Sequence, residues 1–97
     1  METLKLSEQD LINAVCMYVA DQHYAYPENV MAMLTYDDDI GYGADVELNG
    51  RDLEPLTEPK LIQAIRKYLE EAYSIDPFAV SIRLEIEDQD GMVAYVD

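Results

Sequence analysis

LSEQDLINAVCMYV (residues 6–19) and LTEPKLIQAIRKYL (residues 56–69) are two versions of one stretch, fifty positions apart. The match continues without a gap through residues 6–47 and 56–97, and thirteen of the forty-two pairs are identical, where average composition gives about three. The identical residues of the first copy are Leu6, Glu8, Leu11, Ile12, Ala14, Tyr18, Pro27, Val30, Leu34, Asp38, Gly41, Ala44 and Val46. This pattern predicts a tandem duplication.

Each copy has the pattern of one helix followed by two strands. Ser7 and Thr57 are typical helix N-caps, and apolar residues then recur at helical spacing for about sixteen residues, ending before Pro27 and Pro77. Alternating residues predict strands at 30–37, 43–49, 79–87 and 92–96, with a turn at Asp90-Gly91.

The sequence therefore predicts an α+β fold in which two α-β-β units share one core. We expect a four-stranded antiparallel sheet with both helices packed on one face. The whole chain, 1–97, forms a single domain, with repeat one at 6–47, a linker at 48–55 and repeat two at 56–97. The order of the strands stays open.

The charge is strongly negative along the whole chain. Twenty-one acids against six bases give a net charge of −15, which disfavours nucleic acids and anionic membranes and favours basic partners or simple solvation. The one cysteine, Cys16, has no partner for an internal disulfide, and we see neither a signal peptide nor an apolar run long enough to span a membrane. These features predict a reduced, cytoplasmic setting.

The second copy indicates which strand positions face water. There Val80, Ile82, Leu84 and Ile86 alternate with polar residues, so the apolar set should face the helices. Applied to the other strands, this phase places four apolar residues on the open face of the sheet: Met31, Met33, Val93 and Tyr95. Exposed methionines suit adaptable partner surfaces, so we predict an interface there; scattered surface apolar residues are the alternative.

The two helices differ in the polarity of one side. Cys16, Met17 and Ala20 of the first helix stand where the second has the charged residues Arg66, Lys67 and Glu70. The more apolar first helix either packs on another subunit or partner, or has a wider core face. Both alternatives stay open.

Aromatic residues and the lone histidine concentrate near the end of the first helix. A small ligand pocket built from His23, Tyr24, Tyr26 and Tyr42 would bring an imidazole and phenols together for general acid–base chemistry. Histidines at helix ends more often act as caps, and loop tyrosines more often seal a core edge. We predict no catalytic residue and no cofactor.

The acids Asp37, Asp38 and Asp39, with Asp45 beyond a glycine, invite comparison with a calcium loop. The spacing lacks the acid at position five and the glutamate at position twelve of an EF-hand. Turn chemistry explains the run better, so we predict no metal site there. Cys16 and His23 have no further ligands for zinc.

Three segments carry a resemblance to a known family: residues 6–16 (LSEQDLINAVC), residues 37–44 (DDDIGYGA) and residues 61–65 (LIQAI). They are similar to the YxcD-like family of short, uncharacterised proteins from Gram-positive bacteria. The resemblance covers nearly the whole chain and implies a small α+β protein of unknown function. It supplies no functional residues.

Three hypotheses for function follow. The first is a non-enzymatic interaction module, a homodimer or a binder of a protein partner, that uses the open sheet face. The second is an acidic decoy or inhibitor of a basic nucleic-acid-binding protein. The third is a minor ligand or enzymatic site near His23.

Overall fold

The computed structural model describes residues 3–97. The elements along the chain are β1 (Leu4–Leu6), α1 (Glu8–Gln22), the 3-10 helix η1 (Pro27–Asn29), β2 (Val30–Asp37), β3 (Gly41–Leu48), β4 (Arg51–Asp52), α2 (Glu58–Tyr73), β5 (Ile82–Glu87) and β6 (Gly91–Val96). Both predicted helices and both predicted hairpins are present.

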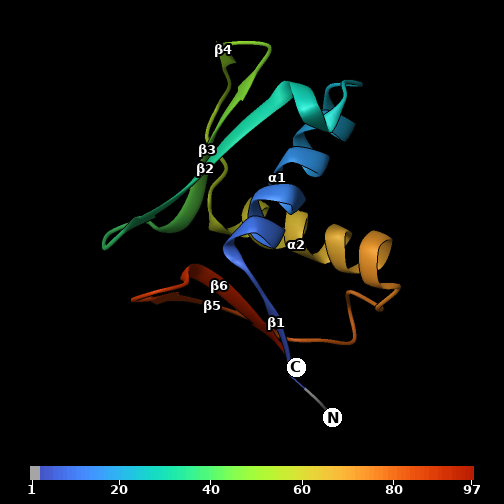
Figure 1. Cartoon of the computed structure of the whole chain (residues 1–97), viewed down its shortest axis with the longest axis vertical. Helices are drawn as coiled ribbons and strands as arrows, with labels where there is room; N and C mark the ends of the chain where they lie inside the picture. Colours follow the sequence, from blue (N-terminus) through green and yellow to red (C-terminus); the bar gives the residue numbers. More distant parts are fainter. Residues whose placement is uncertain (1–2) are drawn as a thin grey trace.

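The strands form two antiparallel sheets rather than the predicted single four-stranded sheet. Their orders are β2-β3-β4 and β1-β6-β5. The general α+β prediction is confirmed, and the single sheet with its one open face is wrong. Figure 1 shows the two sheets on different sides of the helices: the β2-β3-β4 sheet lies to their left, and the β1-β6-β5 sheet lies below them.

The physical reason is that each hairpin pairs with the segment just before a helix, instead of with the other hairpin. In one sheet Leu6 of β1 pairs with Ala94 of β6. In the other, Leu56 forms an isolated bridge with Ala44 of β3. The β1-β6-β5 sheet therefore takes its third strand from the other half of the chain, and the β2-β3-β4 sheet takes one added bridge from it.

Contacts recur at positions fifty residues apart. The Leu6–Ala94 pair corresponds to the Leu56–Ala44 bridge. In both, a residue just before the helix of one half pairs with the second hairpin strand of the other half. Likewise, Glu8 Oε2 accepts a hydrogen bond from Met92 N at 3.2 Å, and Glu58 Oε1 accepts one from Tyr42 N at 3.0 Å. The residues at the start of each helix thus hold the hairpin of the opposite half.

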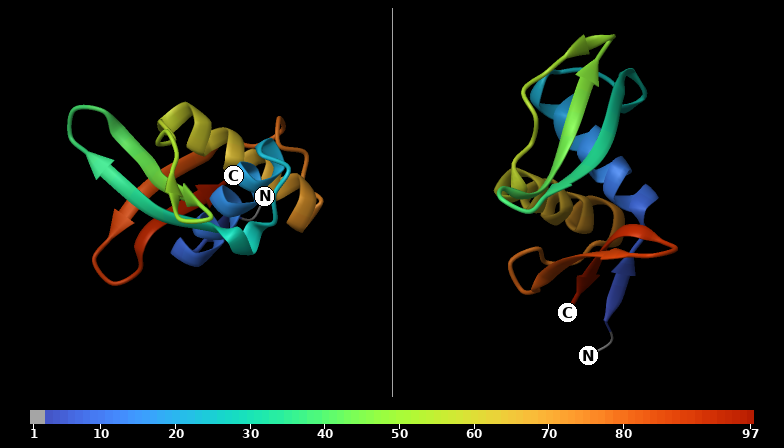
Figure 2. Two further views of the ribbon diagram at one scale, coloured as in Figure 1. Left: turned by 90° about the horizontal axis from the view of Figure 1, so that it is seen from above. Right: turned by 90° about the vertical axis from the view of Figure 1, so that its left-hand side faces the viewer.

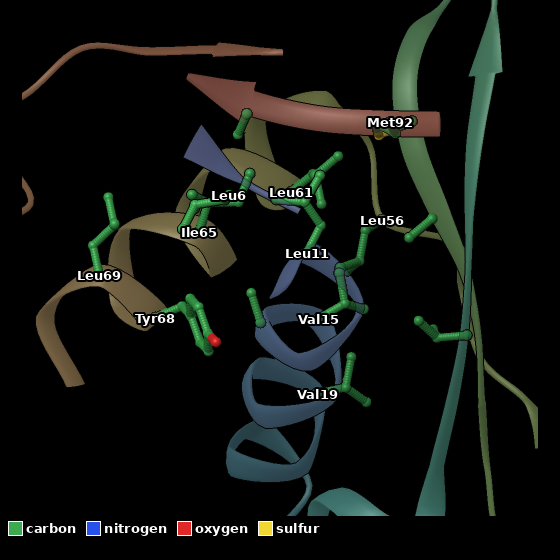
Figure 3. Packing of buried hydrophobic residues seen from close by; sticks show 14 of the residues in the cluster. Leu6, Leu11, Val15, Val19, Leu56, Leu61, Ile65, Tyr68, Leu69 and Met92 are labelled. Atoms are coloured by element: carbon green, nitrogen blue, oxygen red, sulfur yellow. The ribbon is translucent and has the colours of Figure 1, made fainter. Parts of the chain in front are cut away.

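The core lies between the helices and the inner faces of both sheets (Figure 3). Its largest fully buried side chains are Leu6, Leu11, Leu61, Ile65, Leu69, Val15 and Val93. All of these except Val93 belong to one contiguous apolar cluster. Such burial is the main favourable contribution to folding.

The first turn of α1 shows why this helix begins where it does. Ser7 Oγ accepts from Asp10 N at 3.1 Å, and Asp10 Oδ2 accepts from Ser7 N at 2.9 Å, which together form a capping box. Thr57 is the N-cap of α2 but makes no side-chain hydrogen bond there.

The more apolar outer side of α1 has a structural explanation. Ala20 is buried, and Cys16 and Met17 are half-buried and pack against the core. A wider core face therefore accounts for these residues within the chain. It follows from the position of α1, which contacts β1, β2, β6 and α2.

Candidate functional site

The open face of the β2-β3-β4 sheet carries the two exposed methionines. Val30 is buried and Ala32 packs on the core, whereas Met31 and Met33 are 70% and 68% exposed. The predicted alternation is confirmed from Val30 to Met33, because successive side chains of a strand point to opposite faces. It is wrong beside the hairpin turns, where Tyr36 and Ile86 share the inward phase but are 49% and 54% exposed.

Acidic residues lie beside these methionines, on the two neighbouring strands. Met31 lies opposite Glu47 and Met33 opposite Asp45 in the register of β2 with β3, and Asp52 of β4 lies opposite Glu47. The five side chains line a shallow hollow of about 250 Å³. We call the surface formed by Met31, Met33, Asp45, Glu47 and Asp52 the methionine face.

Asp52 was not predicted from the sequence as part of this surface, although a signal was present. Asn49 and Gly50 have φ of 53° and 81°, the left-handed pair that a two-residue hairpin turn requires. The turn brings Arg51 opposite Leu48, so the segment assigned to the linker begins with a short strand. Asn-Gly between strands is itself a strong turn signal.

Val93 and Tyr95 belong to the other sheet, so the four predicted interface residues do not form one surface. Val93 is fully buried (0% exposed), which contradicts its predicted place on an accessible face. The reason is that β6 is the central strand of its sheet, with β1 on one side and β5 on the other. The three-residue strand β1 is what the sequence analysis overlooked.

Tyr95 is half-buried within a polar network on the outer face of the β1-β6-β5 sheet. Its ring lies beneath the Arg83 guanidinium, 4.9 Å from the centroid, and its hydroxyl donates to Glu87, a bond that raises the pKa of the phenol. Lys5 Nζ contacts Glu87 at 2.9 Å and Asp90 at 2.8 Å.

The same network lowers the pKa of both carboxyl groups. For Glu87 the cause is first the Tyr95 hydroxyl and then Lys5, and for Asp90 it is Lys5. Arg83 pairs with Glu85 at 2.6 Å. Within residues 3–97, the acids of the methionine face make no such ion pair, so the two outer faces differ in character.

The predicted ligand pocket is divided between the two ends of the β2-β3 hairpin. His23, Tyr24 and Tyr26 are exposed or largely exposed at the end of α1, near the start of β2. Tyr42 lies near the opposite end, where its ring packs 4.9 Å from that of Tyr36. The structure therefore does not bring Tyr42 to the histidine.

Each part of that group has a local structural role. The backbone N–H of His23 donates to Val19 O at 3.1 Å and closes the last turn of α1. Burial raises the pKa of the Tyr42 phenol, and nearby Tyr36 and Glu58 add to the effect. Half-buried Tyr42 packs against the core, as tyrosines at core edges commonly do.

The acids at the tip of the β2-β3 hairpin form a turn. Asp37 Oδ1 accepts from Asp39 N at 2.7 Å and from Ile40 N at 3.3 Å, the hydrogen bonds of an aspartate turn. Asp45 lies four register positions away, opposite Met33. Across residues 3–97 there is no group of three His, Cys, Asp or Glu side chains arranged to hold a metal ion.

Neither helix, in the part of the chain that the structure describes, has the length and apolar character needed to cross a membrane.

The fold and its surfaces define a small, acidic α+β protein. The chain belongs to the family described as "Protein of unknown function (DUF2653)", whose sequence profile matches residues 1–89. It is similar to "Uncharacterized protein YxcD" of Bacillus subtilis (strain 168), with 27% identity over 94 residues, covering 96% of this chain and 91% of the relative. The resemblance to YxcD-like proteins is thereby confirmed. No solved structure matches this chain.

Proposed function

We propose that the chain is a non-enzymatic interaction module that uses the methionine face to bind a protein, either another copy of itself or a different partner. The observation that carries this proposal is the exposure of Met31 and Met33 side by side on an otherwise regular strand. Large apolar side chains that remain exposed together are typical of contact surfaces.

The chemistry of the surface supports the same conclusion. A methionine side chain is unbranched and polarisable, so it adapts to the shape of a partner at little steric cost. The acids Asp45, Glu47 and Asp52 form a polar rim beside it, as in protein interfaces with an apolar centre.

The other half of the chain provides an internal comparison. The positions fifty residues after Met31 and Met33 are Ser81 and Arg83, and Arg83 is paired with Glu85. A scaffold of this type therefore does not require methionines at these positions. Their presence on β2 alone favours a role in contact over a role in folding.

Met31→Glu tests the proposal, with Ser81→Glu as the matched control. Both residues are exposed, and both changes add one negative charge. We expect Met31→Glu to lower the mass measured by light scattering at a given protein concentration, or to abolish binding to a different partner. Ser81→Glu should leave both unchanged.

A photoreactive amino acid placed at position 33, or at position 83 as the control, makes the test independent of which partner is bound. We expect intermolecular adducts from position 33 and none from position 83. Equal yields from both positions, together with equal effects of the two glutamate variants, would contradict the proposed function.

A further inference from the structure

We propose that β2 pairs edge to edge with β2 of a second copy of this chain, which joins two three-stranded sheets into one continuous sheet. This inference rests on the proposed function and names the partner and the atoms that recognise it.

The hydrogen-bond pattern fixes which backbone groups of β2 point outward. Asn49 N donates to Asn29 O at 3.0 Å, one position before the Val30–Leu48 pair. In an antiparallel ladder, bonded and non-bonded pairs alternate. The N–H and C=O groups of Ala32, Leu34 and Tyr36 therefore point away from β3.

A second contact confirms this direction. Cys16 Sγ lies 3.5 Å from Val30 O, on the side of β2 that faces away from β3. The outward N–H and C=O groups of Ala32, Leu34 and Tyr36 make no hydrogen bond to any other group within residues 3–97. Figure 2 shows β2 as the free border of its sheet.

The other sheet borders are protected, each in a way that natural proteins commonly use. β4 has two residues, and β1 has three, with Lys5 at its centre. β5 is longer, but Arg83, Glu85 and Glu87 place a charge at every second position. Short strands and charged side chains both discourage pairing with another chain.

β2 has none of these protections. It is eight residues long, and the sequence VMAMLTY from Val30 to Tyr36 contains no charge, proline or glycine. β2 and β5 occupy equivalent places in the two halves, fifty residues apart, so the difference between them is not imposed by the fold. An uncharged border of this length is a template for another strand.

A second copy is the partner that this border fits. When β2 pairs antiparallel with itself across a twofold axis, the uncharged run meets the same uncharged run. The methionines of both chains then gather on one face of the joined sheet. Leu34 and the half-exposed Tyr36 gather on the other, so both faces bury apolar surface.

The acids nearest the methionines do not prevent this pairing, because Asp45 and Glu47 lie on β3, one strand back from the border. Three strand spacings separate β3 from β3 of the second copy, or about 14 Å. The Debye length at physiological ionic strength is about 8 Å, so the repulsion is largely screened. Added salt should therefore strengthen the contact, whereas it would weaken binding to a basic partner.

Amide hydrogen exchange of the full chain, measured together with its mass over a concentration series, tests the inference. We expect a dimer in which the amides of Ala32, Leu34 and Tyr36 exchange more slowly than those of Ile82, Leu84 and Ile86. The β5 amides are the control within the same molecule. They also point outward, because Ser81 and Asp97 form a hydrogen-bonded pair and the next pair, Ile82 with Val96, is therefore non-bonded. With nine chains in ten paired, exchange at the β2 border should slow about tenfold.

Ala32→Pro supplies a second measurement. It removes an outward N–H that has no partner within the chain, and proline is tolerated at such edge positions. We expect this variant to keep its fold and to lose both the dimer mass and the protection. Dilution of the unaltered chain should remove the same protection, so the test stands even where the variant does not fold.

Two results would overturn edge pairing. The first is a dimer whose β2 amides exchange as fast as those of β5. Such a dimer would dock through the methionine faces, which buries the methionines and not the border, so the proposed function would remain intact. A chain that is monomeric at every concentration and salt would exclude the second copy. Position-33 adducts with another protein would then show that the proposed function survives alone.

Discussion

At the scale of single residues, two glutamates connect the halves of the molecule. Glu58 accepts from Tyr42 N, and the adjacent Gly41 has φ of 86°. A Cβ added at Gly41 would meet the Glu58 carboxylate, so the absence of a side chain provides the space for this bond. Glu8 and Gly91 form the equivalent arrangement in the other half.

This arrangement predicts non-additive losses of stability. Glu58→Ala removes a charge-assisted bond to a backbone N–H and should lower the free energy of unfolding by about 1–2 kcal/mol. Gly41→Ala should cost about as much, because it adds left-handed strain and displaces the same carboxylate. In the double variant the loss should be smaller than the sum, as measured by urea denaturation.

Glu54→Ala is the control for these variants. Glu54 is exposed and takes part in no side-chain hydrogen bond within the described residues, so its removal should change stability by less than about 0.5 kcal/mol. Strictly additive losses for Gly41→Ala and Glu58→Ala would show that the glycine and the carboxylate act independently.

At the scale of elements, the charges on β5 are a test of what keeps a sheet border free. Arg83→Met with Glu85→Thr would give β5 the residues that β2 has at the equivalent positions. We expect this double variant to form assemblies larger than a dimer, because each chain would then carry two unprotected borders. Sedimentation velocity measures the size distribution.

The reverse exchange is the matched control. Met33→Arg with Thr35→Glu gives β2 the charges of β5, and we expect it to be monomeric. A double β5 variant that sediments as the unaltered chain does would show that these charges do not determine which border pairs.

The elements also show how far the sequence alone could predict this fold. Helices and hairpins depend on near neighbours, so N-caps, apolar periodicity and turn residues located α1, α2 and both hairpins within a few residues. The pairing between hairpins and pre-helix strands joins distant residues such as Leu6 and Ala94. A three-residue strand has too few positions to show alternation, so nothing local announced it.

The residues of the candidate site show the same difference between what near neighbours determine and what distant pairing determines. The exposure of Met31 and Met33 followed from alternation within one strand and is confirmed. The exposure of Val93 depended on whether β6 was central, which is a property of the sheet and not of the strand. The distance between Tyr42 and His23 likewise depended on the orientation of the β2-β3 hairpin relative to α1.

At the scale of the whole molecule, each half supplies a segment that pairs with the hairpin of the other half. β1 belongs to the half that contains α1 but pairs with β6, and Leu56 precedes α2 but pairs with β3. The half that contains α2 is therefore left without β1, and the half that contains α1 keeps its three strands but loses the Leu56 bridge; each half keeps only part of the core.

Two fragments test this dependence. We expect residues 1–54 and residues 55–97, made separately, to show no cooperative thermal unfolding by circular dichroism. Mixed in equal amounts, they should regain the unfolding transition of the intact chain, with a midpoint that rises with concentration because the association is now bimolecular. A cooperative transition in either fragment alone would contradict the mutual dependence of the halves.

The pairing of β1 with β6 also sets an order of events during synthesis. The strands of the β2-β3-β4 sheet, with Leu56, fall within residues 30–56 and can associate while the rest of the chain is still being made. β1 is translated first among the elements, yet its partner, residues 91–96, is translated last. Contacts between such distant segments form slowly. One sheet can thus assemble on the ribosome, whereas the other must wait until translation has passed β6.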